Sequence, residues 1–368
     1  MNSSWELLAT TIASVGELDG PLMEMAGNRQ LLLAKPVNAL GRLERLGIRL
    51  AGITRQLRAP LTPRSVMICA ADHGVVQENV SAFDTAVTAQ MVRNCLAGGA
   101  AVSVLARKFH ANITVLDVGI AEDLADHPHL RKDKIQYGTN NFARATAMTR
   151  QDAVSAIEAG IRAATAEVDA GARLLIAGDM GIGNTTVSAA IAAIMTELPV
   201  SQVTGMGSGI GLLGWRRKCG IIEQALTLHL PDANDPIDVL SKVGGFEIAA
   251  LVGVIIAGAA ARVPVLLDGI ASAAAAAIAV KLCMGAKSFV IAAHCTVEPG
   301  HAALLDYLDI APVLDLDLAL GEGTGALLAL PILEAAVATL NDMTTFDDAE
   351  IDRPRSLESS AVWEPMVA

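Results

Sequence analysis

The sequence has few aromatic residues, few cysteines and no charge excess of the kind that binds nucleic acid. Aromatic residues make up only 3% of the 368 residues, so small and aliphatic side chains must fill the large core that a hydrophobic content of 52% predicts. The five cysteines are scattered and include no CxxC pair, which argues against a disulfide framework and a zinc knuckle. This balance is typical of an α/β enzyme of the reducing cytoplasm.

The chain also lacks a positive charge excess and a long hydrophobic segment. Its formal net charge is -12, which argues against nucleic acid as a partner, because phosphate backbones are bound by clustered Lys and Arg. Residues 1–20 show no signal-peptide pattern. The apolar runs at 248–261 and 269–280 are shorter than the roughly 20 residues of a membrane span. We therefore expect no membrane span.

A proline-marked junction near residue 62 divides the chain. Residues 1–62 carry hydrophobic residues near a helical period, which predicts amphipathic helices. After this junction, short apolar runs alternate with Ala-rich stretches, which predicts an α/β fold with a parallel sheet and right-handed crossovers. The expected strands are residues 65–71, 113–118, 173–177, 263–267, 288–293 and 313–318.

Polar or glycine-rich segments stand at the ends of these expected strands. Ligands of open α/β sheets bind beyond the carboxyl ends of the strands, so the segments predict one binding edge. They are residues 72–74, 117–119, 178–186, 268–269, 294–301 and 321–325.

Two of these segments combine glycines with residues that could contact a ligand. Residues 181–186, Gly-Ile-Gly-Asn-Thr-Thr, precede an expected helix at 187–194. They could bind an anion through backbone N–H groups, or they form an ordinary strand-to-helix turn. In residues 321–325, Gly-Glu-Gly-Thr-Gly, Glu322 is either a general base with a pKa raised by burial or a solvated turn carboxylate.

Other charged residues have both a functional and a structural interpretation. Arg217 and Lys218 follow a glycine-rich segment at 205–209 and could hold a phosphate, or they belong to a solvated helix face. Glu247 opens an apolar helix, where the helix dipole favours an acid, or it is a second carboxylate of a ligand site.

The seven histidines show no spacing typical of metal ligands. His73 follows Asp72, and His294 and His301 share another segment. We interpret them as polar loop residues with local hydrogen bonds and expect no metal site.

Taken together, these segments resemble the nicotinate-nucleotide:dimethylbenzimidazole phosphoribosyltransferases, from about Lys35 to Phe346. A chance match of so many segments in the same order would be rare. The matching segments are Ala-Asp-His-Gly-Val (71–75), Val-Thr-Ala-Gln-Met (87–91), Gly-Gly-Ala (98–100), Met-Gly-Ile-Gly-Asn-Thr-Thr (180–186), Gly-Gly-Phe-Glu-Ile-Ala-Ala (244–250), Glu-Pro-Gly-His (298–301) and Leu-Gly-Glu-Gly-Thr-Gly-Ala (320–326).

The resemblance implies a fold, an activity and an assembly. A Rossmann-like parallel sheet would form the large catalytic domain, residues 63–329, and both chain ends, residues 1–62 and about 330–368, would form a small helical domain. The enzyme would transfer the ribose phosphate of nicotinate mononucleotide to the lower-ligand base of a cobamide, dimethylbenzimidazole first of all. Nicotinate and an α-riboside 5′-phosphate would be the products, and a homodimer without a cofactor would be the assembly.

The resemblance also assigns roles to residues of this sequence. Glu322 matches the catalytic base, which would deprotonate the incoming acceptor. Ser81 and Gln90 match positions of the acceptor-base pocket, and Asp179 is a candidate second carboxylate. The residues implied to hold the nucleotide and its phosphate are Gly181, Gly183, Asn184, Thr185, Lys218, Gly321, Gly323 and Thr324.

Three departures from the family pattern bear on the substrate. Asp84 and Ala86 stand where members usually have proline and glutamate, residues 37–39 read Val-Asn-Ala in place of Pro-Gly-Ser, and Asp179 replaces a glutamate. Two alternatives stay open: a phenol or p-cresol phosphoribosyltransferase subunit of a heterodimer, and a non-catalytic nucleotide-binding partner subunit. Retention of Glu322 favours an enzyme.

Overall fold

The computed structural model describes residues 5–353, which form two compact units. One unit contains residues 5–16 and 63–328, and the other contains residues 17–62 and 329–353. The expected small domain differs at its N-terminal end, because α1 (Glu6–Ala13) packs against helices α6 and α11 of the larger unit, where Leu8 is buried. Residues 1–4 and 354–368, which were also expected in the small domain, lie outside the described residues.

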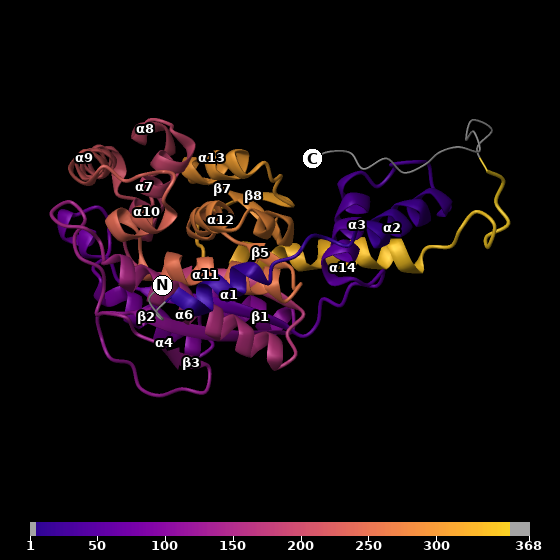
Figure 1. Ribbon diagram of the computed structural model, residues 1–368, viewed down its shortest axis with the longest axis horizontal. Coiled ribbons are helices and arrows are strands. Elements are labelled where there is room, and N and C mark those ends of the chain that lie inside the picture. The colour runs from indigo at the N-terminus through magenta and orange to yellow at the C-terminus, as the bar shows by residue number, and fades with distance from the viewer. Residues whose placement is uncertain (1–4, 354–368) are drawn as a thin grey trace. The chain divides into compact units, whose positions relative to one another are not determined.

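A parallel sheet forms the centre of the larger unit (Figure 1). Its six strands have the order β3-β2-β1-β4-β5-β6, which is the Rossmann order, so the expected fold class is confirmed. The strands are β1 (Arg64–Ala71), β2 (Ala111–Gly119), β3 (Leu130–Lys132), β4 (Leu174–Met180), β5 (Val265–Leu267) and β6 (Val290–Ala292). All of β1 is buried, as is usual for a strand covered by helices on both faces.

Two strands differ from the sequence expectation. β8 (Leu314–Leu318), expected in the main sheet, pairs instead with β7 (His294–Thr296) in a separate two-stranded sheet. Its alternating leucines and aspartates leave it largely exposed, and such a pattern does not suit the interior of a doubly covered sheet. β3 was not expected, because its three residues are too few to form an apolar run.

Helices surround the main sheet, and α6 (Arg150–Asp169) lies beside α11 (Phe246–Ala260) (Figure 1). Both helices contact β1 and β2. The other helices of this unit are α4 (Ala86–Leu96), α5 (Ala101–Lys108), α7 (Asn184–Thr196), α8 (Val200–Val203), α9 (Gly211–His229), α10 (Pro236–Val243), α12 (Ile270–Leu282) and α13 (Pro299–Leu308), with 3-10 turns η2 (Gly74–Glu78) and η3 (Met284–Phe289).

Glycines allow the close approach of α6 and α11. A Cβ atom at Gly160 in α6 would collide with the backbone carbonyl oxygen of Ala250, and one at Gly253 in α11 would collide with that of Ile157. Because the obstacle is backbone in both cases, no side-chain movement can relieve it.

We expect Gly160→Ala to lower the free energy of unfolding by about 1–3 kcal/mol, because the added methyl group overpacks the helix crossing. Gly220→Ala in α9 is the matched control: nothing lies within 4 Å of its added Cβ, so the better helix propensity should stabilise the protein by up to about 1 kcal/mol. Urea unfolding followed by circular dichroism measures both. Equal effects of the two substitutions would contradict the proposed collision.

The smaller unit contains α2 (Gly20–Leu32), α3 (Arg42–Thr54) and most of α14 (Thr324–Asp342). These three helices share a core of small and aliphatic side chains. The core residues are Ala26, Ile48, Ala51 and Leu340, with Leu22, Met23 and Leu57 packed against them. The ammonium of Lys35 lies 2.8 Å from the carboxylate of Glu44, and both side chains are nearly excluded from water.

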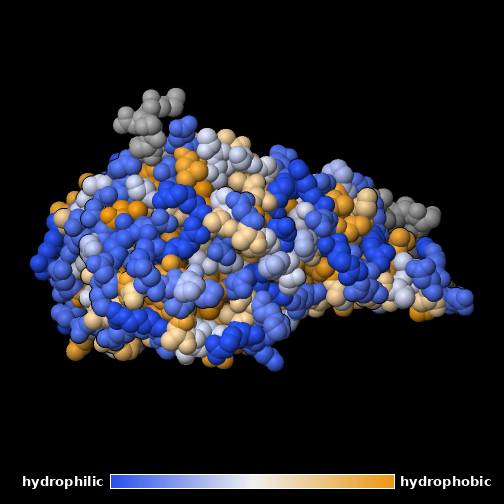
Figure 2. Space-filling model, turned by 90° about the horizontal axis from the view of Figure 1, so that it is seen from below, coloured by the Kyte–Doolittle hydropathy of each residue, from blue (hydrophilic) through white to orange (hydrophobic). Residues whose placement is uncertain are grey.

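Among the described helices, α14 is the one that is long and apolar enough to cross a membrane. However, 56% of its apolar window is buried inside the protein, as in a core helix of a soluble protein. On the face seen in Figure 2, hydrophobic residues lie scattered among hydrophilic ones.

Candidate active site

Three of the expected glycine-rich or polar segments meet at the carboxyl ends of β1 and β4. The chain leaves β1 toward β2 and leaves β4 toward β5 on the opposite side, so the two loops part at a topological switch point. A Cβ atom at Gly181 would lie 3.0 Å from Nε2 of His73, so the loops after β1 and β4 are in contact. The backbone carbonyl oxygen of Glu322 lies 2.6 Å from the Cβ position of Gly178, which brings in the third segment.

Glu322 projects from a backbone that favours glycine. Gly321, Glu322 and Gly323 have φ angles of 84°, 63° and 98°, and only the middle residue carries a side chain. A non-glycine residue in this region costs roughly 1–2 kcal/mol.

The carboxyl group of Glu322 is buried, with only 6% of the residue exposed, so the alternative of a solvated turn carboxylate is wrong. The backbone N–H of Val102, in the first turn of α5, donates a hydrogen bond to this carboxyl group. Oε2 has no hydrogen-bond partner within residues 5–353. Burial raises the pKa of Glu322, and the nearby charge of Asp268 raises it further.

Asp179 lies at the end of β4, beside the segment of Glu322. The side-chain amide of Asn184 donates to its Oδ2 at 2.5 Å, and the Cβ position of Gly321 lies 3.6 Å from its Oδ1. Burial and the neighbouring Asp268 raise the pKa of Asp179 to about 8. The carboxyl group is therefore mostly protonated at neutral pH and can donate a hydrogen bond.

Lys218 lies within α9 and is wholly buried, so its interpretation as part of a solvated helix face is wrong. Its Nζ donates to the hydroxyl of Thr185 at 2.8 Å and approaches the carbonyl oxygen of Gly205 at 3.4 Å. Burial lowers the pKa of Lys218 to about 8, although Glu298 opposes this shift. A buried ammonium with few acceptors is well suited to an anion. The neighbouring Arg217 is exposed.

The glycine-rich loop at 205–209 contacts both Lys218 and the segment of the expected acceptor pocket around Ser81. The N–H of Gly207 donates to Oε1 of Glu298 at 2.8 Å. The hydroxyl of Ser208 accepts from the N–H of Ala82 at 3.0 Å and lies 3.3 Å from that of Ser81. The structure thus brings Ser81 to this loop, whereas it leaves Gln90 exposed on α4.

Other buried polar residues lie near these loops. His73, expected to be a polar loop residue with local hydrogen bonds, is instead buried beside Glu247, far away in the sequence. Nε2 of His73 lies 3.0 Å from Oε1 of Glu247, and both side chains are wholly excluded from water. Burial lowers the pKa of His73, but Glu247 more than offsets this, so its pKa lies above the ordinary value. Glu247 thus forms a buried pair in addition to occupying the first turn of α11. Asp268 and Glu298 are also buried. The sequence signal that could have identified Asp268 as a site residue is its position directly after an apolar strand.

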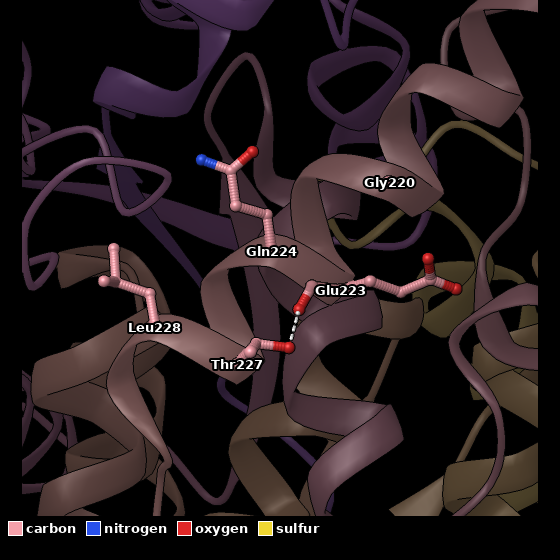
Figure 3. Close-up of a pocket in the computed structure, with 5 residues that line it drawn as sticks. All are labelled: Gly220, Glu223, Gln224, Thr227 and Leu228. Atoms are coloured by element: carbon pink, nitrogen blue, oxygen red, sulfur yellow. Dashed lines mark hydrogen bonds between the residues drawn. The ribbon is translucent and has the colours of Figure 1, made fainter.

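The larger hollow that we find in the structure lies away from these residues. It has a volume of about 630 Å³ and is lined by residues of α9 alone: Gly220, Glu223, Gln224, Thr227 and Leu228 (Figure 3). A site needs polar groups that converge from several elements, so we do not assign function to this hollow. A smaller one of about 210 Å³ is lined by Asp72, Thr85, Ala86, Ala89, Ala121 and Glu122. Ala86, one of the departures from the family pattern, lines this hollow together with Asp72, and both Ala86 and Asp84 are exposed.

Among residues 5–353, no group of three or more His, Cys, Asp or Glu side chains is placed to hold a metal ion. All five cysteines are free thiols. The expectation that the enzyme works without a metal stays a prediction.

The Rossmann-order sheet and the polar site at its edge are consistent with the family to which the sequence comparison assigns the chain. A family model described as phosphoribosyltransferase matches residues 15–351, and the chain belongs to this family.

Comparison with individual relatives shows which members of the family this chain is similar to. The chain is 50% identical over 349 residues to the nicotinate-nucleotide--dimethylbenzimidazole phosphoribosyltransferase of Chloroflexus aggregans, covering 95% of this chain and 99% of the relative. It is 46% identical to the protein of that name from Desulforudis audaxviator, covering 95% and 99%. The crystal structure of the Thermus thermophilus protein of that name matches with a TM-score of 0.87 at 43% identity, covering 92% and 100%. The family resemblance inferred from the motifs is confirmed.

Proposed function

We propose that this enzyme transfers the ribose phosphate of nicotinate mononucleotide to a lower-ligand base, dimethylbenzimidazole in the first instance, for cobamide assembly. The observation that carries the proposal is the buried carboxyl group of Glu322, whose Oε2 lacks a partner among the described residues. It lies at the same edge of the sheet as the buried ammonium of Lys218, since Glu322 contacts Gly178 near the end of β4 and Lys218 contacts Thr185 in the segment that follows β4.

Glu322 would act as the general base. Its carboxylate takes the N–H proton of the acceptor, whose ring nitrogen forms a bond to C1′ of the ribose. The bond from C1′ to nicotinate breaks, and its electron pair neutralises the pyridinium nitrogen of the leaving group. Attack from the opposite face inverts C1′ and gives the α-riboside 5′-phosphate. Alignment of two substrates in one site supplies much of the acceleration.

The nucleotide would be held by the two glycine-rich segments, at the end of β4 and at the start of α14, and by Lys218 of α9. The ammonium of Lys218 and the hydroxyl of Thr185 would bind the phosphate together with backbone N–H groups of the two glycine-rich segments. The protonated carboxyl of Asp179, positioned by Asn184, would donate to the nucleotide. These segments contribute Gly181, Gly183, Gly321, Gly323 and Thr324.

Ser81 and Gln90 would line the acceptor pocket, and the loop contact of Ser81 with Ser208 supports its place beside the nucleotide. We further propose that the larger unit is the catalytic domain, that the smaller unit is the helical domain, and that the enzyme is a cytoplasmic homodimer. Light scattering of the purified protein measures the assembly.

The deciding assay follows release of nicotinate from nicotinate mononucleotide with 5,6-dimethylbenzimidazole, adenine, phenol or p-cresol as acceptor. Turnover with dimethylbenzimidazole supports the proposal. Turnover with phenols alone would replace it by a phenol phosphoribosyltransferase, and nucleotide binding without turnover on any acceptor would replace it by a binding subunit.

We expect kcat/KM for the nucleotide to fall at both ends of the pH range. It should fall as the pH drops through the raised pKa of Glu322, because only the carboxylate accepts a proton. It should also fall as the pH rises through about 8, because Lys218 then loses its positive charge and Asp179 becomes an anion that repels phosphate. Lys218→Arg combined with Asp179→Asn should flatten the alkaline limb alone. An unchanged alkaline limb in that variant would contradict this assignment.

A further inference from the structure

Asp268, which follows β5 directly, is a carboxylate with no exposure to solvent. A buried charge of this kind requires hydrogen bonds or an ion partner. Its Oδ2 accepts from the backbone N–H of Gly323 at 3.0 Å, and its Oδ1 accepts from that of Ala326 at 2.9 Å. Both donors belong to the segment that carries Glu322.

These two N–H groups lie at the start of α14, where the first N–H groups of a helix have no partner within the helix. The residue before the helix is Gly323, which has no side chain with which to cap it. Asp268 therefore supplies from a neighbouring strand the cap that a serine or aspartate usually supplies locally. The hydroxyl of Thr324 closes the same turn by donating to the carbonyl oxygen of Gly321 at 2.8 Å.

The backbone that Asp268 tethers is the strained one. Residues 321–323 all have positive φ, including Glu322 at 63°. Such a backbone persists only where the surroundings hold it. On one side the carbonyl of Glu322 packs against Gly178 of β4, and on the other side Asp268 provides the polar anchor.

His294 lies beside Asp268. Its Nε2 lies 3.3 Å from Oδ1 of Asp268, and its Nδ1 lies 3.0 Å from the carbonyl oxygen of Cys295. Burial lowers the pKa of His294, but Asp268 and the carbonyl group of Cys295 offset this, so its pKa lies above the ordinary value. The ring packs directly against Gly325, where any side chain would collide with it. This packing explains the last glycine of the Gly-Glu-Gly-Thr-Gly segment.

We infer that Asp268 is a positioning residue, which tethers the first turn of α14 so that the carboxylate of Glu322 is held in place for proton transfer, with His294 packed beside Asp268 and Gly325. The inference rests on the proposed function, in which Glu322 is the base.

Asp268→Asn tests the tether. An asparagine has one acceptor oxygen, and its amide would face the second N–H group, so one of the two tethers is lost and Glu322 shifts. A misplacement of about 1 Å can cost on the order of a hundredfold in rate, and we expect kcat to fall roughly 30- to 100-fold. The KM for nicotinate mononucleotide should change less than about threefold, because Lys218 and Thr185 are untouched.

The chain offers a matched control in Glu167. Its carboxyl group also accepts two hydrogen bonds, from the hydroxyls of Ser65 and Thr114, each at 2.8 Å. Ser65 lies near the start of β1, at the amino end of the sheet and away from the proposed site. Glu167→Gln likewise replaces one acceptor oxygen by an amide, and it should change kcat less than about threefold, because no catalytic group depends on it.

A double-mutant cycle separates positioning from a general structural role. If Asp268 acts through Glu322, then Asp268→Asn should lower the residual kcat of Glu322→Gln by less than about threefold, since the base is already absent. A further 30-fold loss in that background, or an equal loss of kcat from Glu167→Gln, would overturn the inference while leaving the base assignment intact. Full activity of Glu322→Gln would instead overturn the proposed function.

His294→Gln covers the case in which Asp268→Asn does not fold. Glutamine keeps a donor for Asp268 but removes the ring that packs against Gly325, so kcat should fall roughly 3- to 10-fold with an unchanged nucleotide KM. Wild-type kcat in a folded His294→Gln enzyme would overturn the part assigned to His294 and, with it, the support of the tether.

Discussion

Glu322→Gln is expected to lower kcat by a hundredfold or more and to leave the KM for nicotinate mononucleotide nearly unchanged. The amide has almost the same shape as the carboxyl group and can still accept from the N–H of Val102, so the strained turn keeps its packing. It cannot take a proton from the acceptor, and loss of a general base typically costs about 10²- to 10⁴-fold. Release of nicotinate, followed at saturating acceptor, measures the effect.

Glu322→Asp is the companion variant. It keeps a carboxylate base but shortens the side chain by one methylene, so an intermediate kcat is expected. A kcat that decreases in the order wild type, Glu322→Asp, Glu322→Gln would support Glu322 as the base. Near-normal turnover of Glu322→Gln, with an unchanged melting temperature, would exclude Glu322 as the base.

Lys218→Met is expected to change the KM for nicotinate mononucleotide, whereas Glu322→Gln changes kcat. The methionine replaces the buried stem of Lys218 but removes the ammonium, which is hydrogen-bonded to Thr185. Hydrogen bonds to charged groups contribute roughly 1.5–3 kcal/mol, so the KM for nicotinate mononucleotide should rise about 10- to 100-fold. The protein itself should not lose stability, because an apolar side chain replaces a buried charge. Initial rates and thermal unfolding measure the two effects.

Arg217→Met is the matched control, since it removes a positive charge one residue away in the same helix. Arg217 is exposed and donates to the carbonyl oxygen of Asn79, so its replacement should leave the nucleotide KM within about twofold. If both variants raise the nucleotide KM equally, the effect comes from net charge and the buried site assigned to Lys218 is wrong.

The sequence indicates the local backbone of the site where residues are contiguous. Gly-Glu-Gly-Thr-Gly marks the backbone of Glu322, because glycines on both sides of one acid indicate a turn with positive φ. For Lys218 the residues alone left two interpretations open, a phosphate ligand and a solvated helix face, because two adjacent cations are compatible with both. Burial depends on what packs against a helix, and α9 carries Lys218 inward while its neighbour Arg217 stays exposed.

By itself the sequence determined the class of fold and the family, because hydrophobic runs and motif order are local properties of the chain. It also predicted the strands of the main sheet apart from β3, but it wrongly added β8 to them. The tertiary structure alone decided which charges are buried and what they bind. Asp268 reaches Gly323 and Ala326 across more than fifty residues, and His73 meets Glu247 across more than a hundred and fifty. The pKa values of Glu322, Asp179 and Lys218 follow from such contacts, since desolvation and neighbouring charges depend on distances in space and not on separation along the chain.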